Sequence, residues 1–188
     1  MKCLLCKKLS LKIICKSCNN DIKIVPKKRI LLDGLSVYSF FDYDNIEYLL
    51  KSKYSLIGSK IFKILALKAS LYFKNNIADF NEVYAIGIDD KVESYYSHSG
   101  VIVKQFSNIF KPLYGTLKAS NDIHYAGKSL EFRQQNKKGF IYSGKSNINV
   151  VLLDDIITTG ESLKEAREVL QKNGVNVLFA LTLSDANC

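Results

Sequence analysis

The chain has 188 residues, of which 47% are hydrophobic and 24% are charged, and its formal net charge is +9. These values are typical of one ordinary soluble domain with a small appendage. No run reaches the roughly 18 apolar residues of a membrane span, and the first residues lack the apolar core of a signal peptide, so we expect neither a membrane span nor secretion. We therefore expect a cytoplasmic location.

The positive charge is concentrated at the N-terminus. Residues 1–29 contain nine basic residues and one acidic residue, so this segment carries +8, whereas the rest of the chain carries +1. A focused basic segment favours polyanions such as nucleic acid, and the alternative is a solvated lysine-rich tail. The candidate nucleic-acid contacts in this segment are Lys7, Lys8, Lys27, Lys28 and Arg29.

Four of the five cysteines form two close pairs, Cys3-x-x-Cys6 and Cys15-x-x-Cys18. Such pairs fit four thiolates around one tetrahedral ion, and this closed ligand set predicts a structural Zn²⁺. Two disulfides are the alternative, which a reducing cytoplasm disfavours. Four thiolates and Zn²⁺ together carry −2, so the metal would lower the charge of the segment to +6. The fifth cysteine, Cys188, belongs to no pair.

The basic run after Pro26 marks the end of this segment. The sequence therefore predicts two parts, a zinc-binding module over residues 1–29 and a larger domain over residues 30–188.

The larger domain alternates strand-like apolar runs with helical periodicity. Strands are expected at residues 34–44, 82–88, 139–142, 148–153 and 175–183, with a short strand after Pro112. Helices are expected from Asp44, from Gly58, within residues 91–106, and from Gly160 to a stop at Gly174; residues 121–139 are expected to be a long loop or partly helical. This alternation predicts an α/β fold with a mostly parallel sheet and helices on both faces.

The segment LLDDIITTGESL, residues 152–163, carries the strongest chemical signal. Ligands of open α/β sheets bind beyond the carboxyl ends of the strands, where Asp154 and Asp155 are expected. The amides at the start of the following helix can bind a phosphate, and Gly160 lets the backbone approach it closely. The two carboxylates can accept hydrogen bonds from a sugar diol and could sit near a divalent cation. A sugar phosphate satisfies both halves, and the alternative is a plain strand–turn–helix.

This segment resembles the phosphoribosyl pyrophosphate (PRPP) motif of type I phosphoribosyltransferases. Together with the four-cysteine module ahead of it, nearly the whole chain resembles the ComF family of late-competence, DNA-uptake proteins. Two further tracts resemble that family: one contains Arg133, Asn136 and Phe140, and the other is a helix containing Lys51 or Lys53.

The resemblance implies a type I phosphoribosyltransferase-like domain that binds PRPP. It implies that Asp154 and Asp155 hold the ribose hydroxyls and that Mg²⁺ arrives with the ligand. It assigns the 5′-phosphate to Thr158, Thr159, Gly160, Glu161 and Ser162.

The chain departs from the family pattern after the strand at residues 82–88. The loop that binds pyrophosphate in phosphoribosyltransferases would here contain Asp89, Asp90 and Lys91, and two carboxylates suit pyrophosphate poorly unless Mg²⁺ intervenes. Lys91 and His98 could partly compensate, although a histidine is more often a capping or packing residue. This departure puts phosphoribosyl transfer in doubt.

The resemblance implies a factor for natural transformation that binds single-stranded DNA, with a ComFA-type helicase as a second partner. The sequence contains no Walker A motif, so we do not expect this chain to be the motor. Two alternatives stay open at this point. One is an active phosphoribosyltransferase of nucleobase salvage, and the other is a regulator that binds PRPP or a nucleotide without turnover.

Overall fold

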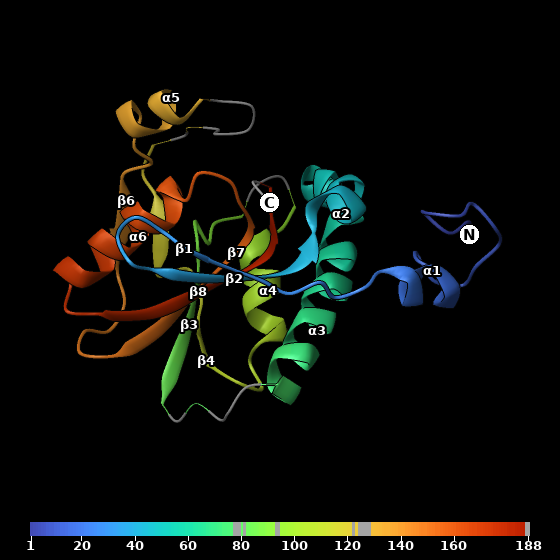
Figure 1. Cartoon of the computed structure of the whole chain (residues 1–188), viewed down its shortest axis with the longest axis horizontal. Coiled ribbons are helices and arrows are strands. Elements are labelled where there is room, and N and C mark those ends of the chain that lie inside the picture. The colour runs from blue at the N-terminus through green and yellow to red at the C-terminus, as the bar shows by residue number, and fades with distance from the viewer. Residues whose placement is uncertain (77–79, 81, 93–94, 122, 124–128, 187–188) are drawn as a thin grey trace.

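The computed structural model of the chain describes residues 1–76, 80, 82–92, 95–121, 123 and 129–186 (Figure 1). Cys188 therefore lies outside the described residues. The chain begins with the four-cysteine segment and helix α1 (Lys16–Asp21), which project from one side of a larger α/β body.

The central sheet has six strands in the order β1-β2-β8-β7-β3-β4. Only β1 runs antiparallel to its neighbour, and the other adjacent pairs are parallel, so the expected mostly parallel sheet is confirmed. The strands are β1 (Lys27–Ile30), β2 (Ser36–Asp42), β3 (Val83–Gly87), β4 (Lys111–Leu113), β7 (Asn149–Ile157) and β8 (Asn176–Asp185). Proline is tolerated at Pro112 because β4 is an edge strand.

Helices cover both faces of the sheet, as expected from the sequence (Figure 1). One face carries α2 (Tyr43–Leu50), the short 3-10 helix η1 (Lys51–Tyr54), α3 (Gly58–Asn76) and α4 (His98–Gln105). The other face carries α6 (Glu161–Lys172), near a small antiparallel sheet of β5 (Leu117–Ala119) and β6 (Phe140–Tyr142). The remaining helix is α5 (Leu130–Gln135).

Two hydrophobic clusters follow from this layering. The larger lies under α2, α3 and α4 and is rich in phenylalanine, with the ring of Phe73 within 5.7–6.3 Å of the rings of Phe40, Phe110 and Phe106. The smaller lies under α6, whose buried residues Leu163, Ala166 and Leu170 are the apolar face expected from the sequence.

Several element boundaries differ from the sequence-based expectation, and two of the differences are described here because they lie near the site. Helix α2 begins at Tyr43 with Asp42 as its N-cap, so the cap expected at Asp44 is two residues too late. Strand β7 continues to Ile157 instead of ending at Leu153, because β8 pairs with it as far as Asp185. Asp154 and Asp155 therefore lie within the strand and not beyond it.

The N-terminal module packs against α3 and shares the larger cluster through Ile14 and Ile22. The Lys68 side chain on α3 donates a hydrogen bond to the carbonyl oxygen of Ile22. Strand β1 begins at Lys27, so the expected domain boundary after residue 29 falls inside this strand. Among the helices of the described residues, none has both the length and the apolar character that crossing a membrane requires.

Candidate functional site

The turn between β7 and α6 has the geometry of an anion-binding loop. Gly160 is the N-cap residue of α6 and adopts φ +87°, a left-handed conformation that strains any other residue. A Cβ atom on Gly160 would also lie 2.9 Å from both terminal carbons of Leu31. Gly160 offers no side chain to cap α6, so the first amides of this 12-residue helix and its dipole are directed at the turn.

Two arginines from distant segments hold this turn. The Arg133 guanidinium, on α5, donates a hydrogen bond to the hydroxyl oxygen of Thr158. The Arg29 guanidinium, on β1, donates to the carbonyl oxygen of Thr158 at 2.6 Å and pairs with Asp185 at 3.3 Å. A small pocket opens at this point, and it is lined by Arg133, Asp154 and residues 156–163. The turn thus combines helix amides, hydroxyls and a guanidinium, which is a suitable donor set for a phosphate.

The sequence could not foresee the contribution of β1 to this site. The contact from Arg29 to Thr158 joins residues 129 positions apart, and nothing in the local pattern around Arg29 or Leu31 indicates it.

The two adjacent carboxylates have different surroundings. Asp155 is buried and its carboxylate oxygen lies 3.1 Å from the ammonium nitrogen of Lys53 on η1. Asp154 is half-buried and lines the pocket of the turn, whereas Asp155 does not. The two side chains nevertheless stay close, with one oxygen of each within 4.8 Å of the other.

The pKa values of the pair move in opposite directions. Burial raises the pKa of Asp154 well above its usual range, and the neighbouring charge of Asp155 raises it further. Burial would also raise the pKa of Asp155, but the Lys53 ammonium outweighs it and holds that pKa below the usual range. Burial likewise opposes the charge of Lys53, yet Asp155 and Asp154 raise its pKa above the ordinary value. The site therefore contains one firmly ionised carboxylate and one that takes up a proton readily.

Lys53, and not Lys51, is the lysine of this site. The resemblance left both open, and the structure places Lys51 in an exposed ion pair with Glu47, 3.0 Å away on α2.

His98 lies at the start of α4, beside the carboxylate pair. A ring nitrogen of His98 and one oxygen each of Asp154 and Asp155 all lie within 4.8 Å of one another. Burial lowers the pKa of His98 to about 4, so the imidazole is neutral at pH 7. A neutral imidazole beside two carboxylates could also hold a divalent cation.

The other acidic pair predicted as a pyrophosphate loop serves as an internal hydrogen-bond acceptor. Asp89 accepts a hydrogen bond from the amide of Ala119 at 2.9 Å, and Asp90 accepts from the amide of Gly115 at 2.6 Å and from the hydroxyl of Ser97. Both carboxylates are buried, and the amide of Lys91 donates to the carbonyl oxygen of Asp89.

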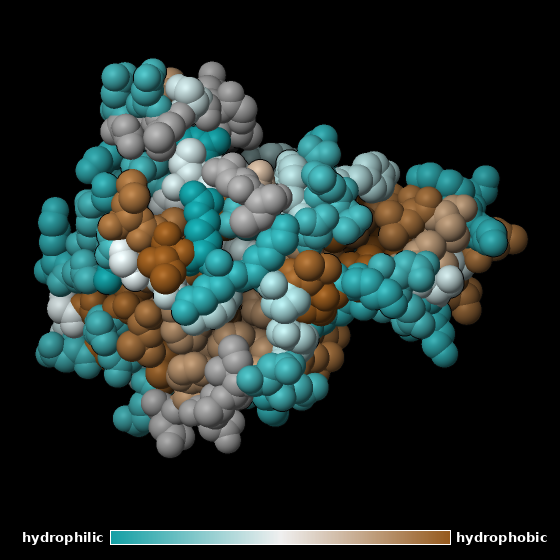
Figure 2. Space-filling view, viewed as in Figure 1, coloured by the Kyte–Doolittle hydropathy of each residue, from teal (hydrophilic) through white to brown (hydrophobic). Residues whose placement is uncertain are grey.

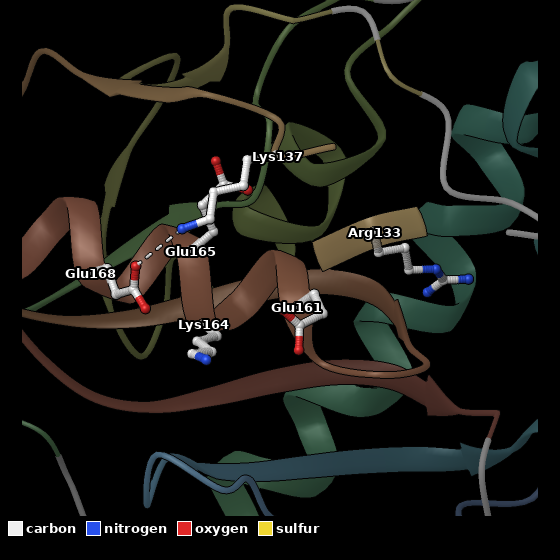
Figure 3. A pocket seen from close by; sticks show the side chains of 6 residues that line it. All are labelled: Arg133, Lys137, Glu161, Lys164, Glu165 and Glu168. Atoms are coloured by element: carbon white, nitrogen blue, oxygen red, sulfur yellow. Dashed lines mark ion pairs between the residues drawn. The ribbon is translucent and has the colours of Figure 1, made fainter. Parts of the chain in front are cut away.

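Asn136 and Phe140, the other two residues of the tract that contains Arg133, have structural contacts. The side chain of Asn136 donates to the carbonyl oxygen of Phe132 at 2.9 Å, and Phe140 is buried in the smaller cluster. Beside α5 lies a second pocket of about 240 Å³, lined mainly by α6 (Figure 3). Arg133 and Glu161 line both pockets, and Figure 3 shows the Arg133 side chain directed away from Lys137 and Glu168.

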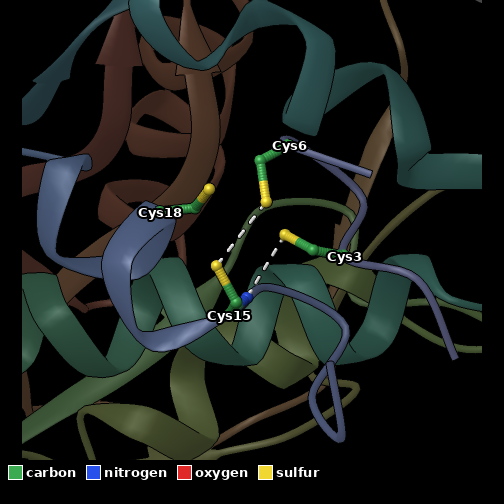
Figure 4. Close-up of side chains that lie close together, drawn as sticks. All are labelled: Cys3, Cys6, Cys15 and Cys18. Atoms are coloured by element: carbon green, nitrogen blue, oxygen red, sulfur yellow. Dashed lines mark hydrogen bonds between the residues drawn. The ribbon is translucent and has the colours of Figure 1, made fainter. Parts of the chain in front are cut away.

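The four N-terminal cysteines converge on one point (Figure 4). Their sulfur atoms all lie within 4.8 Å of one another, and Cys6 and Cys15 are 3.8 Å apart. A tetrahedral zinc site with bonds of about 2.3 Å has sulfur–sulfur edges of about 3.8 Å, so the geometry fits. A hydrogen bond from the amide of Cys15 lowers the pKa of Cys3 to about 6, which favours the thiolate that a metal requires. The cluster could therefore hold a metal such as zinc.

The candidate nucleic-acid residues fall into two groups. Lys7, Lys8 and Lys28 are exposed, and the Lys28 ammonium lies 5.4 Å from the ring centre of Tyr38. Lys27 instead pairs with Asp42 at 3.0 Å, and Arg29 holds the β7–α6 turn.

No protein-family model and no curated protein matches the sequence. Among solved structures, the chain is similar to an adenine phosphoribosyltransferase, with 14% identity, a TM-score of 0.46, and coverage of 90% of this chain and 89% of that one. It is similar to a hypoxanthine phosphoribosyltransferase from Staphylococcus aureus, with 17% identity, a TM-score of 0.41, and coverage of 68% and 64%. It is also similar to a UMP synthase from Leishmania donovani, with 16% identity and a TM-score of 0.39, where the match covers 89% of this chain but spans 30% of that one.

Proposed function

We propose that this chain is a DNA-uptake factor of the ComF type that binds PRPP, or a related sugar phosphate, at the β7–α6 turn. One observation carries the proposal. The start of α6, whose N-cap Gly160 has no side chain, and the carboxyl group of Asp154 line the same pocket, so one surface offers donors for a phosphate and an acceptor for sugar hydroxyls.

The proposed binding mode assigns the residues as follows. The phosphate sits at the turn of residues 158–162, where Arg133 supplies a charged donor. The carboxyl group of Asp154 accepts from the ribose hydroxyls, and Asp155, fixed by Lys53, keeps its neighbour in place. Mg²⁺ would bind the oxygens of the ligand's phosphates together with Asp154, because hard cations prefer oxygen ligands.

For the cysteine cluster we propose one structural Zn²⁺. With four protein sulfurs, the ion has no open position and serves to fold the module. Metal analysis of the purified protein after dialysis is expected to give about one equivalent of zinc. A folded, metal-free protein with two disulfides by mass would refute this assignment.

Single-stranded DNA is the proposed macromolecular partner, bound through the exposed lysines of the N-terminal segment. Since the sequence has no Walker A motif, the energy for transport would come from another protein, such as a ComFA-type helicase. The affinity for a single strand falls with the logarithm of salt concentration, by a slope of about 0.7 for each phosphate neutralised.

The test combines two titrations by calorimetry, one with Mg²⁺-PRPP and one with a short oligonucleotide. Replacing Lys7, Lys8 and Lys28 with Gln is expected to flatten the salt slope for the oligonucleotide by about 2, with PRPP binding unchanged. The matched control replaces Lys118, Lys145 and Lys172, which are exposed on the larger domain, and is expected to leave the slope unchanged. Replacing Asp154 and Asp155 together with Ala is expected to abolish PRPP binding.

The salvage alternative predicts the opposite pattern. Pyrophosphate release from PRPP in the presence of a purine or pyrimidine base would identify an active transferase. In cells, the proposal predicts that the triple lysine variant loses transformation but grows without added nucleobase, whereas normal transformation by that variant would count against it.

A further inference from the structure

A groove of about 550 Å³ lies between the N-terminal module and helix α3, far from the carboxylate pair in sequence and outside the site described above. Its walls come from both elements, with the loop around Leu11 on one side and α3 on the other. Figure 2 shows that apolar surface gathers on the projecting module and is bordered by hydrophilic side chains. Leu11 is fully exposed at this groove.

Helix α3 contributes a second apolar stripe to the groove. Its inner face is buried in the larger cluster by residues such as Phe62, Leu65 and Phe73. Its outer stripe consists of Ile64, Leu67 and Leu71, which follow the spacing of one helical face, and the two leucines are 43% and 49% exposed. A helix that is apolar on two sides is expected to have a partner on each of them.

The charge of the groove is one-sided. None of the described residues that line the groove is acidic. Five of them are lysines: Lys12, Lys16, Lys60, Lys63 and Lys68. The complementary occupant therefore carries carboxylates beside its apolar anchors.

The lining also distinguishes between classes of partner. It contains no aromatic side chain among the described residues, so it offers no platform on which the bases of a single strand could stack. A groove between two elements can accommodate a helix, whereas the flat surface of a bilayer would not fill it. From Lys60 to Leu71 the helix rises about 17 Å, which matches three turns of a partner helix with anchors at i, i+3 or i+4, and i+7.

We propose that the groove between the module and α3 is a docking site for an acidic amphipathic helix of a partner protein. The leucines of α3 and of the module loop receive the apolar face of that helix, and the lysines around the groove pair with its carboxylates. The site is separate from the proposed sugar-phosphate pocket, so either can be lost without the other.

The test measures fluorescence anisotropy of a labelled synthetic peptide with the zinc-loaded full chain. The peptide has leucines at positions i, i+4, i+7 and i+11 and glutamates on the flanking positions. Its controls are a peptide of the same composition with the leucines scrambled and one with lysine in place of glutamate. Saturable binding of the first peptide, with much weaker binding of both controls, is expected.

Variants locate the contact on the protein. Replacing Leu67 and Leu71 together with Ser is expected to weaken peptide binding at least about tenfold, since both are surface residues whose apolar area would be covered on binding. Replacing Lys60 and Lys63 with Gln is a second test that leaves the apolar surface intact, and it is expected to reduce the affinity and its salt dependence. Leu56→Ser removes an exposed leucine outside the groove and is expected to have no effect.

Three results would overturn the proposal. The first is no peptide binding up to about 1 mM, which is the range of non-specific contacts. The second is equal binding to the parent and both groove variants. The third is a result in which the groove variants bind the peptide as the parent does but lose binding to an oligothymidine or to phosphatidylglycerol vesicles. That result would assign the groove to DNA or to a membrane surface. Zinc content and thermal unfolding of each variant show that the fold is intact.

Discussion

Strands β3 and β7 are neighbours in the sheet and run parallel, and the dipeptide Asp-Asp follows the end of β3 and lies within β7. At β3 the pair, Asp89 and Asp90, accepts hydrogen bonds from the amides of Ala119 and Gly115. The Lys138 ammonium also lies 3.6 Å from Asp89. At β7, Asp155 pairs with Lys53 at 3.1 Å and Asp154 lines a pocket. The two pairs therefore have the same composition and a lysine near one carboxylate, but only the pair at β7 has a carboxylate that lines this pocket.

This difference shows that the neighbours of an acidic pair decide whether it can bind a ligand. A carboxylate oxygen that accepts a hydrogen bond from a buried amide supplies a partner that the fold itself needs. The pair at β3 thus has its acceptor capacity occupied by the chain, whereas Asp154 at β7 lines a pocket. We expect substitutions of the pair at β3 to lower stability. At β7, we expect substitution of Asp155 to lower stability and substitution of Asp154 to weaken ligand binding.

The largest effect is expected from Lys53→Met. This substitution leaves the charge of Asp155 buried without its ammonium partner, and the free energy of unfolding should fall by about 3–5 kcal/mol. Chemical denaturation monitored by circular dichroism measures the loss. The double variant with Asp155→Leu removes both charges and should recover most of it. If Lys53→Met alone is as stable as the parent, the ion pair between Lys53 and Asp155 does not distinguish the pair at β7 from the pair at β3.

A pH effect should follow from His98. Its folded pKa of about 4 lies below the unfolded value of about 6.5, so the unfolded chain binds the proton first as the pH falls. The free energy of unfolding should therefore decrease by about 3 kcal/mol between pH 6.5 and pH 4 through this group.

Neighbouring charges enter the same balance. Asp155 and Asp89 favour the charged imidazole, and Lys53 and Lys138 oppose it, but burial dominates. Denaturation of the parent and of His98→Gln across this pH range isolates the contribution, because the variant should show the shallower dependence. Equal slopes in both proteins would contradict a buried neutral imidazole.

A smaller loss, about 2 kcal/mol, is expected for Asp90→Ala. The variant leaves the Gly115 amide and the Ser97 hydroxyl without their acceptor, which is the penalty for unpaired buried donors. Calorimetric affinity for Mg²⁺-PRPP should not change, and Asp90→Asn, which keeps one acceptor oxygen, should lose less stability. Loss of PRPP affinity with unchanged stability would make the β3 pair a ligand site after all.

The smallest effect on stability is expected for Asp154→Asn. Because burial raises the pKa of this carboxyl group, its charged form is unfavourable in the fold, and at pH 7 the amide variant should be no less stable than the parent. Its affinity for the sugar phosphate should nevertheless fall, since the carboxyl group can ionise when the ligand and its Mg²⁺ bind, whereas the amide cannot. Marked destabilisation by this substitution would place Asp154 with the structural carboxylates.

Local patterns were sufficient to predict the elements that flank the site. The apolar run before Asp154 and the helical spacing of Leu163, Ala166 and Leu170 place the turn correctly, because each depends on periodicity within a few residues. The extent of β7 could not be predicted, because it depends on pairing with β8. The environment of Asp155 could not be predicted either, because Lys53 reaches it from a helix about 100 residues earlier in the chain.

The contact between Arg29 and Thr158 has a practical consequence for dissecting the molecule. A chain shortened to begin at Leu31 would appear to remove only the cysteine module, yet it would also delete β1 and the guanidinium that holds the carbonyl group of the turn. Strand β1 thus holds the turn that lines the pocket and also connects the cysteine module to the larger domain. Loss of activity in such a fragment would therefore report damage to the pocket, and separating the two parts experimentally requires a cut before Lys27.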